Sequence, residues 1–183
     1  ASPTARPRIS GDGRFVTFGT LAADLAVFDP TPVDGPVTDM NGGLDVMKAR
    51  IADGALELVS INFALTSTGT GSAGTVSASN PSISRDGSRV AFESTETTML
   101  DPSVFDSLPP FPPPQIYVGA GSGRVSLVSV TPDGRDIGDG ASREPVISRN
   151  GRHVAFVSKA TDLVAGATNT NGFADDIFAR DLK

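Results

Sequence analysis

Two short motifs in this sequence carry the residue types of a calcium site. Both have the form D/N-x-N-G-x-x-D, once over 39–45 and once over 169–175. Calcium binds several oxygen atoms, and carboxylates and amides that alternate around a glycine turn can supply them. The candidate metal ligands are Asp39, Asn41, Asp45, Asn169, Asn171, Asp175 and Asp176. The alternative is that these side chains only form Asx-turns, which close a loop without an ion.

The rest of the composition excludes several other kinds of site. The chain has no cysteine, no tryptophan and a single histidine, His153. Disulfides, thiolate zinc sites, cysteine nucleophiles and sites that need two imidazoles are therefore impossible. No G-x-S-x-G sequence is present to form the nucleophile elbow of a serine hydrolase. We assign no catalytic or cofactor-binding residue, and from these residues we expect no enzyme.

A run of prolines marks one loop in the middle of the sequence. Five of the six residues over Pro109–Pro114 are proline, a composition that favours the stiff, extended polyproline II conformation. Such a segment can dock into an aromatic-lined groove of a partner, or it can serve as a rigid loop of low entropy. We expect the rigid loop, pinned to the fold by Phe105 and Phe111 on either side.

Three gapless copies of one motif supply the elements that position these residues. They run over Pro7–Phe18, Pro81–Phe92 and Pro145–Phe156, and share the form P-x-I-S-x-D/N-G-x-x-V-x-F. Asp-Gly and Asn-Gly between two apolar runs predict a tight β-hairpin, in which both turn residues tolerate positive φ. His153 then occupies a strand position that holds Phe15 and Arg89 in the other copies. This variation indicates a partly exposed strand residue and not a catalytic base.

Each hairpin is followed by further predicted strands. Third strands are expected over 45–50, 115–118 and 176–180, and fourth strands over 56–60 and 124–129. This makes eleven strands in groups of four, four and three. Four antiparallel strands per repeat is the plan of a β-propeller blade. We therefore predict an all-β domain over 1–183, with blades at about 7–65, 80–130 and 144–183, joined by flexible Ser/Thr-rich segments over 66–79 and 131–142.

These repeats resemble the TolB-like (WD40-like) β-propeller repeats. The resemblance lies in P-x-I-S-x-D-G-x-x-V-A-F and in the later strand D-I-F-A-R-D-L, which ends the third copy. It implies a propeller that binds a protein or peptide, without catalysis by the propeller itself, and it supports the recurrence of the D/N-x-N-G-x-x-D loop. Such blades occur in periplasmic scaffold proteins, in gating domains of peptidases and in secreted bacterial proteins.

The number of repeats predicts a partner for this chain. Members of that family usually carry about six blades, and three cannot close a ring. The third copy also lacks a fourth strand, and an unpaired strand edge is a liability that a stable protein covers. We expect either a homodimer, in which two three-blade halves form one ring, or further blades from a longer parent chain.

Charge and location complete the expectations. With 15 basic and 21 acidic residues the net charge is −6. Proteins that bind the phosphates of nucleic acid normally carry a positive charge, so we expect no nucleic-acid partner. No apolar run approaches the roughly 18 residues of a membrane-spanning helix. The acidic balance, the Ser/Thr-rich loops and the resemblance favour an extracytoplasmic bacterial protein, periplasmic or secreted. A start at Ala1-Ser2 suits a mature end left by signal cleavage.

The predicted function is a non-catalytic binding or scaffold module that uses the propeller surface for protein or peptide contacts, stabilised by calcium. One alternative is an enzyme or accessory domain acting on glycans or peptides at the propeller axis. Another is a fragment of a longer propeller with no activity of its own. What lines the axis distinguishes the first two, because converging carboxylates there would favour an enzyme.

Overall fold

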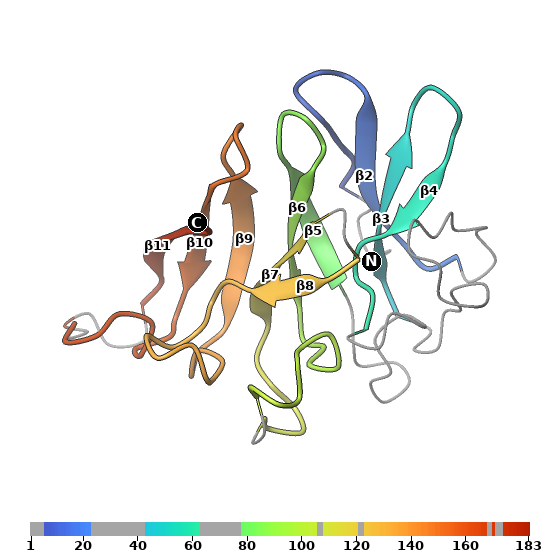
Figure 1. Ribbon diagram of the computed structural model, residues 1–183. Coiled ribbons are helices and arrows are strands. Elements are labelled where there is room, and N and C mark those ends of the chain that lie inside the picture. The colour runs from blue at the N-terminus through green and yellow to red at the C-terminus, as the bar shows by residue number, and fades with distance from the viewer. Residues whose placement is uncertain are drawn as a thin grey trace.

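The computed structural model describes residues 6–22, 43–62, 78–105, 108–120, 123–167, 170 and 174–183. This part of the chain consists of β-strands and turns (Figure 1), which confirms the predicted all-β class. The strands are β1 (Arg8–Ile9), β2 (Phe15–Thr20), β3 (Asp45–Arg50), β4 (Leu56–Leu58), β5 (Ala78–Ile83), β6 (Arg89–Ser94), β7 (Gln115–Ala120), β8 (Val125–Leu127), β9 (Ser142–Ile147), β10 (His153–Ser158) and β11 (Asp176–Asp181). No described residue belongs to a helix that could cross a membrane.

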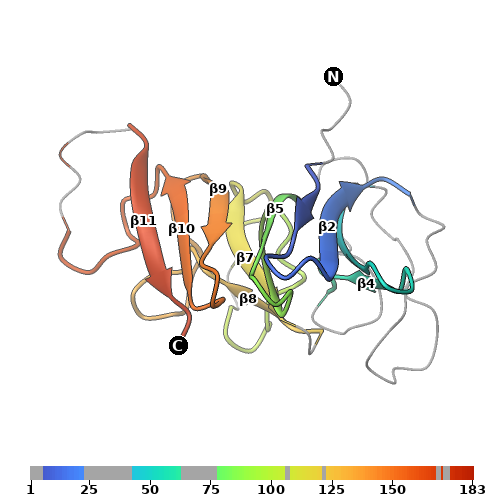
Figure 2. The ribbon, with the colours of Figure 1, turned by 90° about the horizontal axis from the view of Figure 1, so that it is seen from above.

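The strands form three antiparallel sheets of four, four and three strands, as the repeats predicted. Their orders are β1-β2-β3-β4, β5-β6-β7-β8 and β9-β10-β11, so each sheet is a simple meander. We call them the first, second and third sheets. Seen from above, they stand side by side, with β11 at one end and the sheet of β2 and β4 at the other (Figure 2).

The predicted strand bounds differ from the observed ones mainly at the connections. β5 begins at Ala78, inside the segment expected to be a linker. At the second predicted linker, Val130, just before it, pairs with Ile137, and Thr131 N–H donates to the Asp136 carbonyl at 3.0 Å, which closes an ordered turn. These short pairings satisfy backbone groups that a flexible linker would leave to water.

The three hairpin turns use positive φ at one residue only. Gly13, Gly87 and Gly151 have φ of 73°, 72° and 70°, whereas the Asp or Asn before each glycine does not have positive φ. That side chain instead accepts a hydrogen bond from the backbone N–H two residues on, at 3.0–3.1 Å. The expectation of two left-handed residues per turn was therefore wrong, because the Asx side chain closes the turn by hydrogen bonding.

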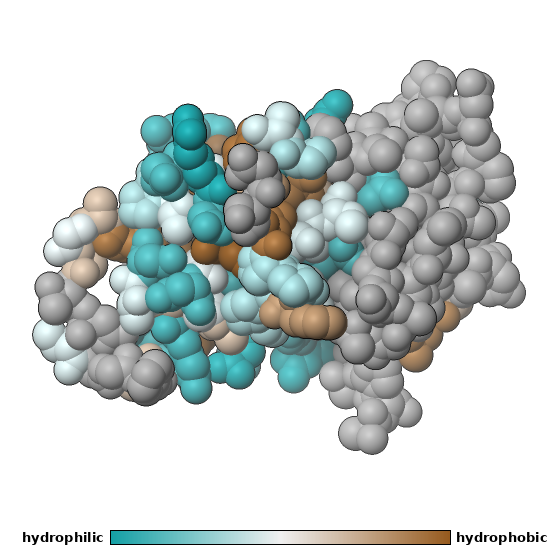
Figure 3. All heavy atoms as spheres, turned by 90° about the horizontal axis from the view of Figure 1, so that it is seen from below, coloured by the Kyte–Doolittle hydropathy of each residue, from teal (hydrophilic) through white to brown (hydrophobic). Residues whose placement is uncertain are grey.

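The hydrophobic core lies between the sheets. Phe92 and Tyr117 of the second sheet pack in one cluster with Val46 of β3 and with Val59, which follows β4. The intervening residues of the same strands, among them Ile116, belong to a second cluster with the third sheet. Both faces of the middle sheet are thus covered, which explains why β6 and β7 each contain a run of three apolar residues, 90–92 and 116–118, instead of an alternation. From below, hydrophobic residues show in the middle of the described surface with hydrophilic residues around them (Figure 3).

The hairpin turns also join neighbouring sheets. A Cβ built on Gly87 would lie 2.2 Å from Cδ2 of Phe15, so this turn rests against the preceding sheet. In the next pair of sheets, Arg89 Nη1 donates to the Gly151 carbonyl at 3.0 Å. Phe15 and Arg89 hold the same place in their repeats, and His153 is the third member. Phe15 and Arg89 are partly exposed, as predicted, and at these two residues one sheet also meets the turn of the next.

The proline-rich loop is anchored at both of its ends. Phe105 and Leu108 are partly buried against the first core cluster. Pro114 O accepts a hydrogen bond from Ser142 N–H at 2.7 Å. Phe111 is 79% exposed. The expectation that the flanking aromatics pin the loop is thus confirmed for Phe105 and wrong for Phe111, which points away from the core.

Candidate functional site: a pocket where three sheets meet

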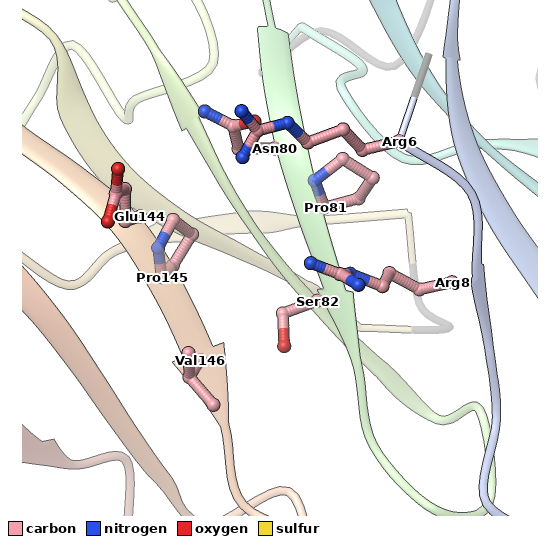
Figure 4. Close-up of a pocket in the computed structure, with 8 residues that line it drawn as sticks. All are labelled: Arg6, Arg8, Asn80, Pro81, Ser82, Glu144, Pro145 and Val146. Carbon is pink, nitrogen blue, oxygen red and sulfur yellow. The ribbon is translucent and has the colours of Figure 1, made fainter. Parts of the chain in front are cut away.

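The first strands of the three sheets adjoin one another and enclose a pocket of about 440 Å³, which we call the axial pocket. Figure 4 shows side chains from all three sheets turned toward this space. The pocket is lined by Arg6, Arg8, Asn80, Pro81, Ser82, Glu144, Pro145 and Val146. A pocket with a few convergent polar groups at the meeting point of repeated units is the usual form of a propeller binding site.

The lining residues occupy equivalent places in the three repeats. Each repeat contributes the residues on either side of its first proline, which are Arg6 and Arg8, Asn80 and Ser82, and Glu144 and Val146. The repeats did not predict this site, because their constant positions form the hairpins and the lining comes from the variable ones. The signal that could have predicted the lining is variation. The residues beside the constant proline differ widely among the three repeats, so the fold itself does not require them.

The backbone at two of these places is strained. Asn80 and Glu144, which precede Pro81 and Pro145, have φ of 50° and 55°. Residues other than glycine rarely adopt this left-handed backbone conformation. The pairing register of both first strands shifts at the same point, which is the sign of a β-bulge. Bulges redirect side chains, and backbone strain concentrates at functional sites. This geometry therefore indicates that the lining is a functional site.

Glu93 holds two of the lining strands together. Its carboxylate on β6 accepts hydrogen bonds from Ser79 Oγ at 3.0 Å, from Asn80 Nδ2 at 2.5 Å and from the Glu144 backbone N–H at 3.1 Å. The equivalent residues of the other sheets, Gly19 and Val157, have no such side chain. Hydrogen bonds to a charged acceptor are stronger than neutral ones. Glu93 is therefore a positioning residue that fixes β5 and β9 at the pocket.

The charge of the lining contrasts with that of the chain. Arg6 and Arg8 oppose a single acidic lining residue, Glu144, in a protein of net charge −6. Within the part of the chain that the structure describes, neither guanidinium has an ion pair or hydrogen bond. In Figure 4 both extend from the β1 side toward the side that carries Glu144. The pocket thus offers unsatisfied donors to an incoming group.

The lining residues do not form a hydrolytic arrangement. Ser82 is the only hydroxyl among them, and its Oγ accepts a hydrogen bond from Ile147 N–H at 3.1 Å. His153 lies on β10 and is not part of the lining. Glu144 is the one lining carboxylate, whereas glycoside hydrolysis needs two that face each other. The arrangement can bind a ligand, but among the described residues it pairs no nucleophile with a base.

The predicted calcium ligands are only partly within the described residues. Asp39, Asn41, Asn169 and Asn171 lie outside them. Asp45 Oδ1 accepts a hydrogen bond from Ser60 Oγ at 3.2 Å. Asp175 pairs with Arg143 at 3.4 Å, and Asp176 begins β11.

A second repeat explains the hydrogen bond of Asp45. Gln115 holds the equivalent place, and its Oε1 accepts from Ser129 Oγ at 2.6 Å. In both sheets the serine oxygen also accepts the next backbone N–H of the third strand, at 3.1 and 2.9 Å. The second repeat lacks the D/N-x-N-G-x-x-D motif, so this bond does not depend on a metal. No cluster of three or more acidic or histidine residues exists among the described residues, and the calcium site stays a prediction.

Comparison with known proteins supports the fold. No protein-family model matches the sequence, and no curated protein matches it. Among solved structures, the chain is similar to TolB from Acinetobacter baumannii, with 16% identity and a TM-score of 0.48 over 98% of this chain and 30% of that one. It is similar to a putative TolB from Agrobacterium tumefaciens, with 15% identity and a TM-score of 0.50 over 100% of this chain and 47% of that one. It is also similar to the tricorn protease, with 10% identity and a TM-score of 0.47 over 96% of this chain and 13% of that one.

The chain therefore has a TolB-like β-propeller fold, as the repeats predicted. It spans less than half the length of the two TolB chains that it matches. At this identity the likeness is one of fold alone.

Proposed function

We propose that this protein is a non-catalytic binding module that takes a protein or peptide segment into the axial pocket. The observation that carries the proposal is the pair of guanidinium groups of Arg6 and Arg8, which have no ion pair among the described residues and lie in a preformed pocket whose lining has no catalytic pair. Preformed concave sites with a few placed polar groups are typical of ligand binding. We place the protein outside the bacterial cytoplasm, in the periplasm or secreted, as its acidic composition favours.

Filling the pocket tests this proposal. Val146 lines the pocket and is 62% exposed, so Val146→Trp should block the space without disturbing the core. We expect random peptides displayed on phage to be enriched by the wild-type protein and not by this variant. Val164→Trp is the matched control, because Val164 is 51% exposed and lies outside the lining. Equal enrichment by all three proteins would place binding elsewhere on the surface.

We further propose that the outer face of the third sheet is covered by a second copy of the chain. Val46, Ile116 and Ile177 hold equivalent places, and the first two are 0% exposed whereas Ile177 is 82% exposed. A large apolar side chain at a place that is buried in the other two sheets favours an interface. Two copies of three sheets would close a ring of six blades and complete the wall of the axial pocket. The alternative is further blades of a longer chain.

The solution mass tests the dimer. We expect light scattering to give about twice 18.8 kDa for the wild type. For Ile177→Asp we expect a single chain, because an aspartate cannot be buried there without a partner. Ile51→Asp is the control, since Ile51 is 53% exposed in a turn. A wild-type monomer at micromolar concentration would exclude the second copy and favour additional blades.

The solution mass and the melting temperature, each measured with calcium and with a chelator, test the proposed ion. If the two D/N-x-N-G-x-x-D loops bind calcium, the ion should raise the melting temperature, because a ligand that binds only the folded state stabilises it. A loss of the dimer in chelator would place the ion in the assembly. An unchanged melting temperature and mass would retire calcium and leave the Asx-turn interpretation.

A further inference from the structure

We infer that the ligand group seated in the axial pocket is a single carboxylate, carried by an acidic residue of the bound peptide. This inference rests on the proposed function, since it names the chemistry that the pocket recognises. It comes from the shape of the guanidinium donors, the charge of the lining and the apolar walls beside them.

Arg8 supplies the geometry. A guanidinium presents parallel N–H donors in a planar fork that matches the two oxygens of a carboxylate. Arg8, the first residue of β1, extends toward Ser82 on β5, and Arg6 extends in the same direction (Figure 4). Neither side chain has an ion pair or hydrogen bond within the described residues, so their donors are available to a ligand. A carboxylate that enters between β1 and β5 meets the fork of Arg8 and the charge of Arg6.

The charge of the lining selects among anions. Two guanidinium groups face the Glu144 carboxylate in the lining, and the Glu93 carboxylate adjoins it, since Glu93 accepts hydrogen bonds from the Asn80 side chain and the Glu144 backbone N–H. A singly charged carboxylate brings one further negative charge beside these two acidic groups. A phosphate group, which carries nearly two negative charges at neutral pH, brings nearly twice as much. Like charges at close range disfavour binding, so the lining favours a carboxylate over a phosphate.

The other walls suit the rest of an acidic residue within a peptide. Pro81, Pro145 and Val146 offer apolar surface beside the charged groups, on which methylene groups of a ligand can pack. The bulged strands that carry these residues are tied together by Glu93, so the walls are fixed before the ligand arrives. A preformed site loses less conformational entropy on binding than a flexible one.

Three blocked pentapeptides test the inference by nuclear magnetic resonance. Each has two glycines on either side of a central residue, which is glutamate, glutamine or phosphoserine. We expect the glutamate peptide to bind at least tenfold more tightly than the glutamine peptide and to shift the Nε–Hε signals of Arg6 and Arg8. The phosphoserine peptide should bind more weakly than the glutamate peptide.

Variants assign the effect to the pocket. Arg8→Met keeps the length of the side chain and should abolish the preference for glutamate, whereas Arg8→Lys, which keeps the charge without the fork, should retain part of it. Arg14→Met is the control, because Arg14 is exposed and pairs with Asp12 at 2.7 Å, away from the lining. A melting curve for each variant shows that it remains folded, as expected for exposed residues.

The outcomes separate this inference from the proposed function. Equal binding of the glutamate and glutamine peptides at the Arg8 signal would overturn the carboxylate and leave a peptide-binding pocket. Tighter binding of the phosphoserine peptide would overturn the charge argument and make phosphate the recognised group. No shift with any of the three peptides would overturn the carboxylate inference and also contradict a peptide site in this pocket.

Discussion

Replacing Gly87 with alanine should destabilise the fold by about 2–5 kcal/mol, far more than the same change at Gly13. Both glycines have nearly the same left-handed φ, 72° and 73°, so both variants bear the roughly 1–2 kcal/mol cost of that conformation for an L-residue. Only at Gly87 would the new Cβ also meet a neighbour, Cδ2 of Phe15 at 2.2 Å. Overpacking of this kind adds about 1–3 kcal/mol.

The difference between the two variants measures how tightly the first and second sheets pack. Urea unfolding of both, together with Phe15→Ala and the double variant Phe15→Ala with Gly87→Ala, gives a double-mutant cycle. Removing the Phe15 ring should restore much of the stability lost at Gly87 and leave the Gly13 variant unaffected. If the Gly87 and Gly13 variants lost equal stability, the turn would not bear on the neighbouring sheet.

Replacing Tyr117 with phenylalanine should raise the free energy of unfolding by about 1 kcal/mol. Tyr117 is 0% exposed, and its hydroxyl is the one buried side-chain polar atom without a partner among the described residues. An unsatisfied buried polar group costs about 1–3 kcal/mol. The ring stacks on Phe92 with centroids 5.8 Å apart, and in the third sheet Phe178 stacks on Phe156 with the same separation and no hydroxyl. The third sheet thus already shows the proposed substitution.

The effect should grow at alkaline pH. Burial, and next to it the Glu96 carboxylate, raise the pKa of Tyr117 well above its ordinary value of 10.0. Above pH 10 the unfolded chain releases this proton while the folded chain keeps it. The wild type should therefore lose about 1.4 kcal/mol of stability per pH unit there. The phenylalanine variant lacks this loss.

Ultraviolet absorbance checks this prediction directly. Tyr117 is the only tyrosine of the chain, so any tyrosinate signal belongs to it. In the folded protein the signal should stay absent until the chain unfolds. A reversible titration near pH 10 in a protein that keeps its native circular dichroism would contradict the buried position, and a phenylalanine variant less stable than the wild type would mean that the hydroxyl has a partner.

Both predictions concern the contacts that keep the axial pocket in shape. The pocket draws its walls from three sheets that are joined mainly through side-chain packing and through the turns. Backbone hydrogen bonds from Asp12 N–H to Arg85 O at 3.0 Å and from Arg85 N–H to Arg149 O at 2.9 Å link the same turns. A shift of one sheet against the next would therefore move Arg8 relative to Glu144 and change the site.

Local sequence was enough to predict where most strands and the three hairpin turns lie, although it did not predict that only the glycine of each turn has positive φ. The hairpin residues act over a few positions, because a glycine at positive φ and an Asx side chain that caps its own turn need no distant partner. The repetition of P-x-I-S-x-D/N-G then indicated three like units and their sheet order. The bounds of β1, β4 and β8 were less well predicted, since strands of two or three residues are set by pairing and not by pattern.

The site depended on contacts that no local pattern encodes. Arg6, Asn80 and Glu144 are far apart in the chain and come together only because the first strands of three sheets adjoin. The role of Glu93 likewise required the bulges that bring β5 and β9 within its reach. In the same way, Ile116 and Ile177 have equivalent sequence positions, but their exposures are 0% and 82%. Only the packing of the sheets causes this difference.

The sequence by itself determined three β-meanders of the TolB-like kind, their Asx-glycine turns and the absence of cysteine and multi-histidine chemistry. These follow from short-range sterics, from side-chain periodicity and from composition. The tertiary structure decided that the variable residues beside each proline face one pocket, that Phe15 and Arg89 meet the next sheet's turn, and that Ile177 of the third sheet is 82% exposed where its equivalents are buried. The physical reason is that convergence and burial depend on how whole sheets stack, and stacking is a property of the assembled fold.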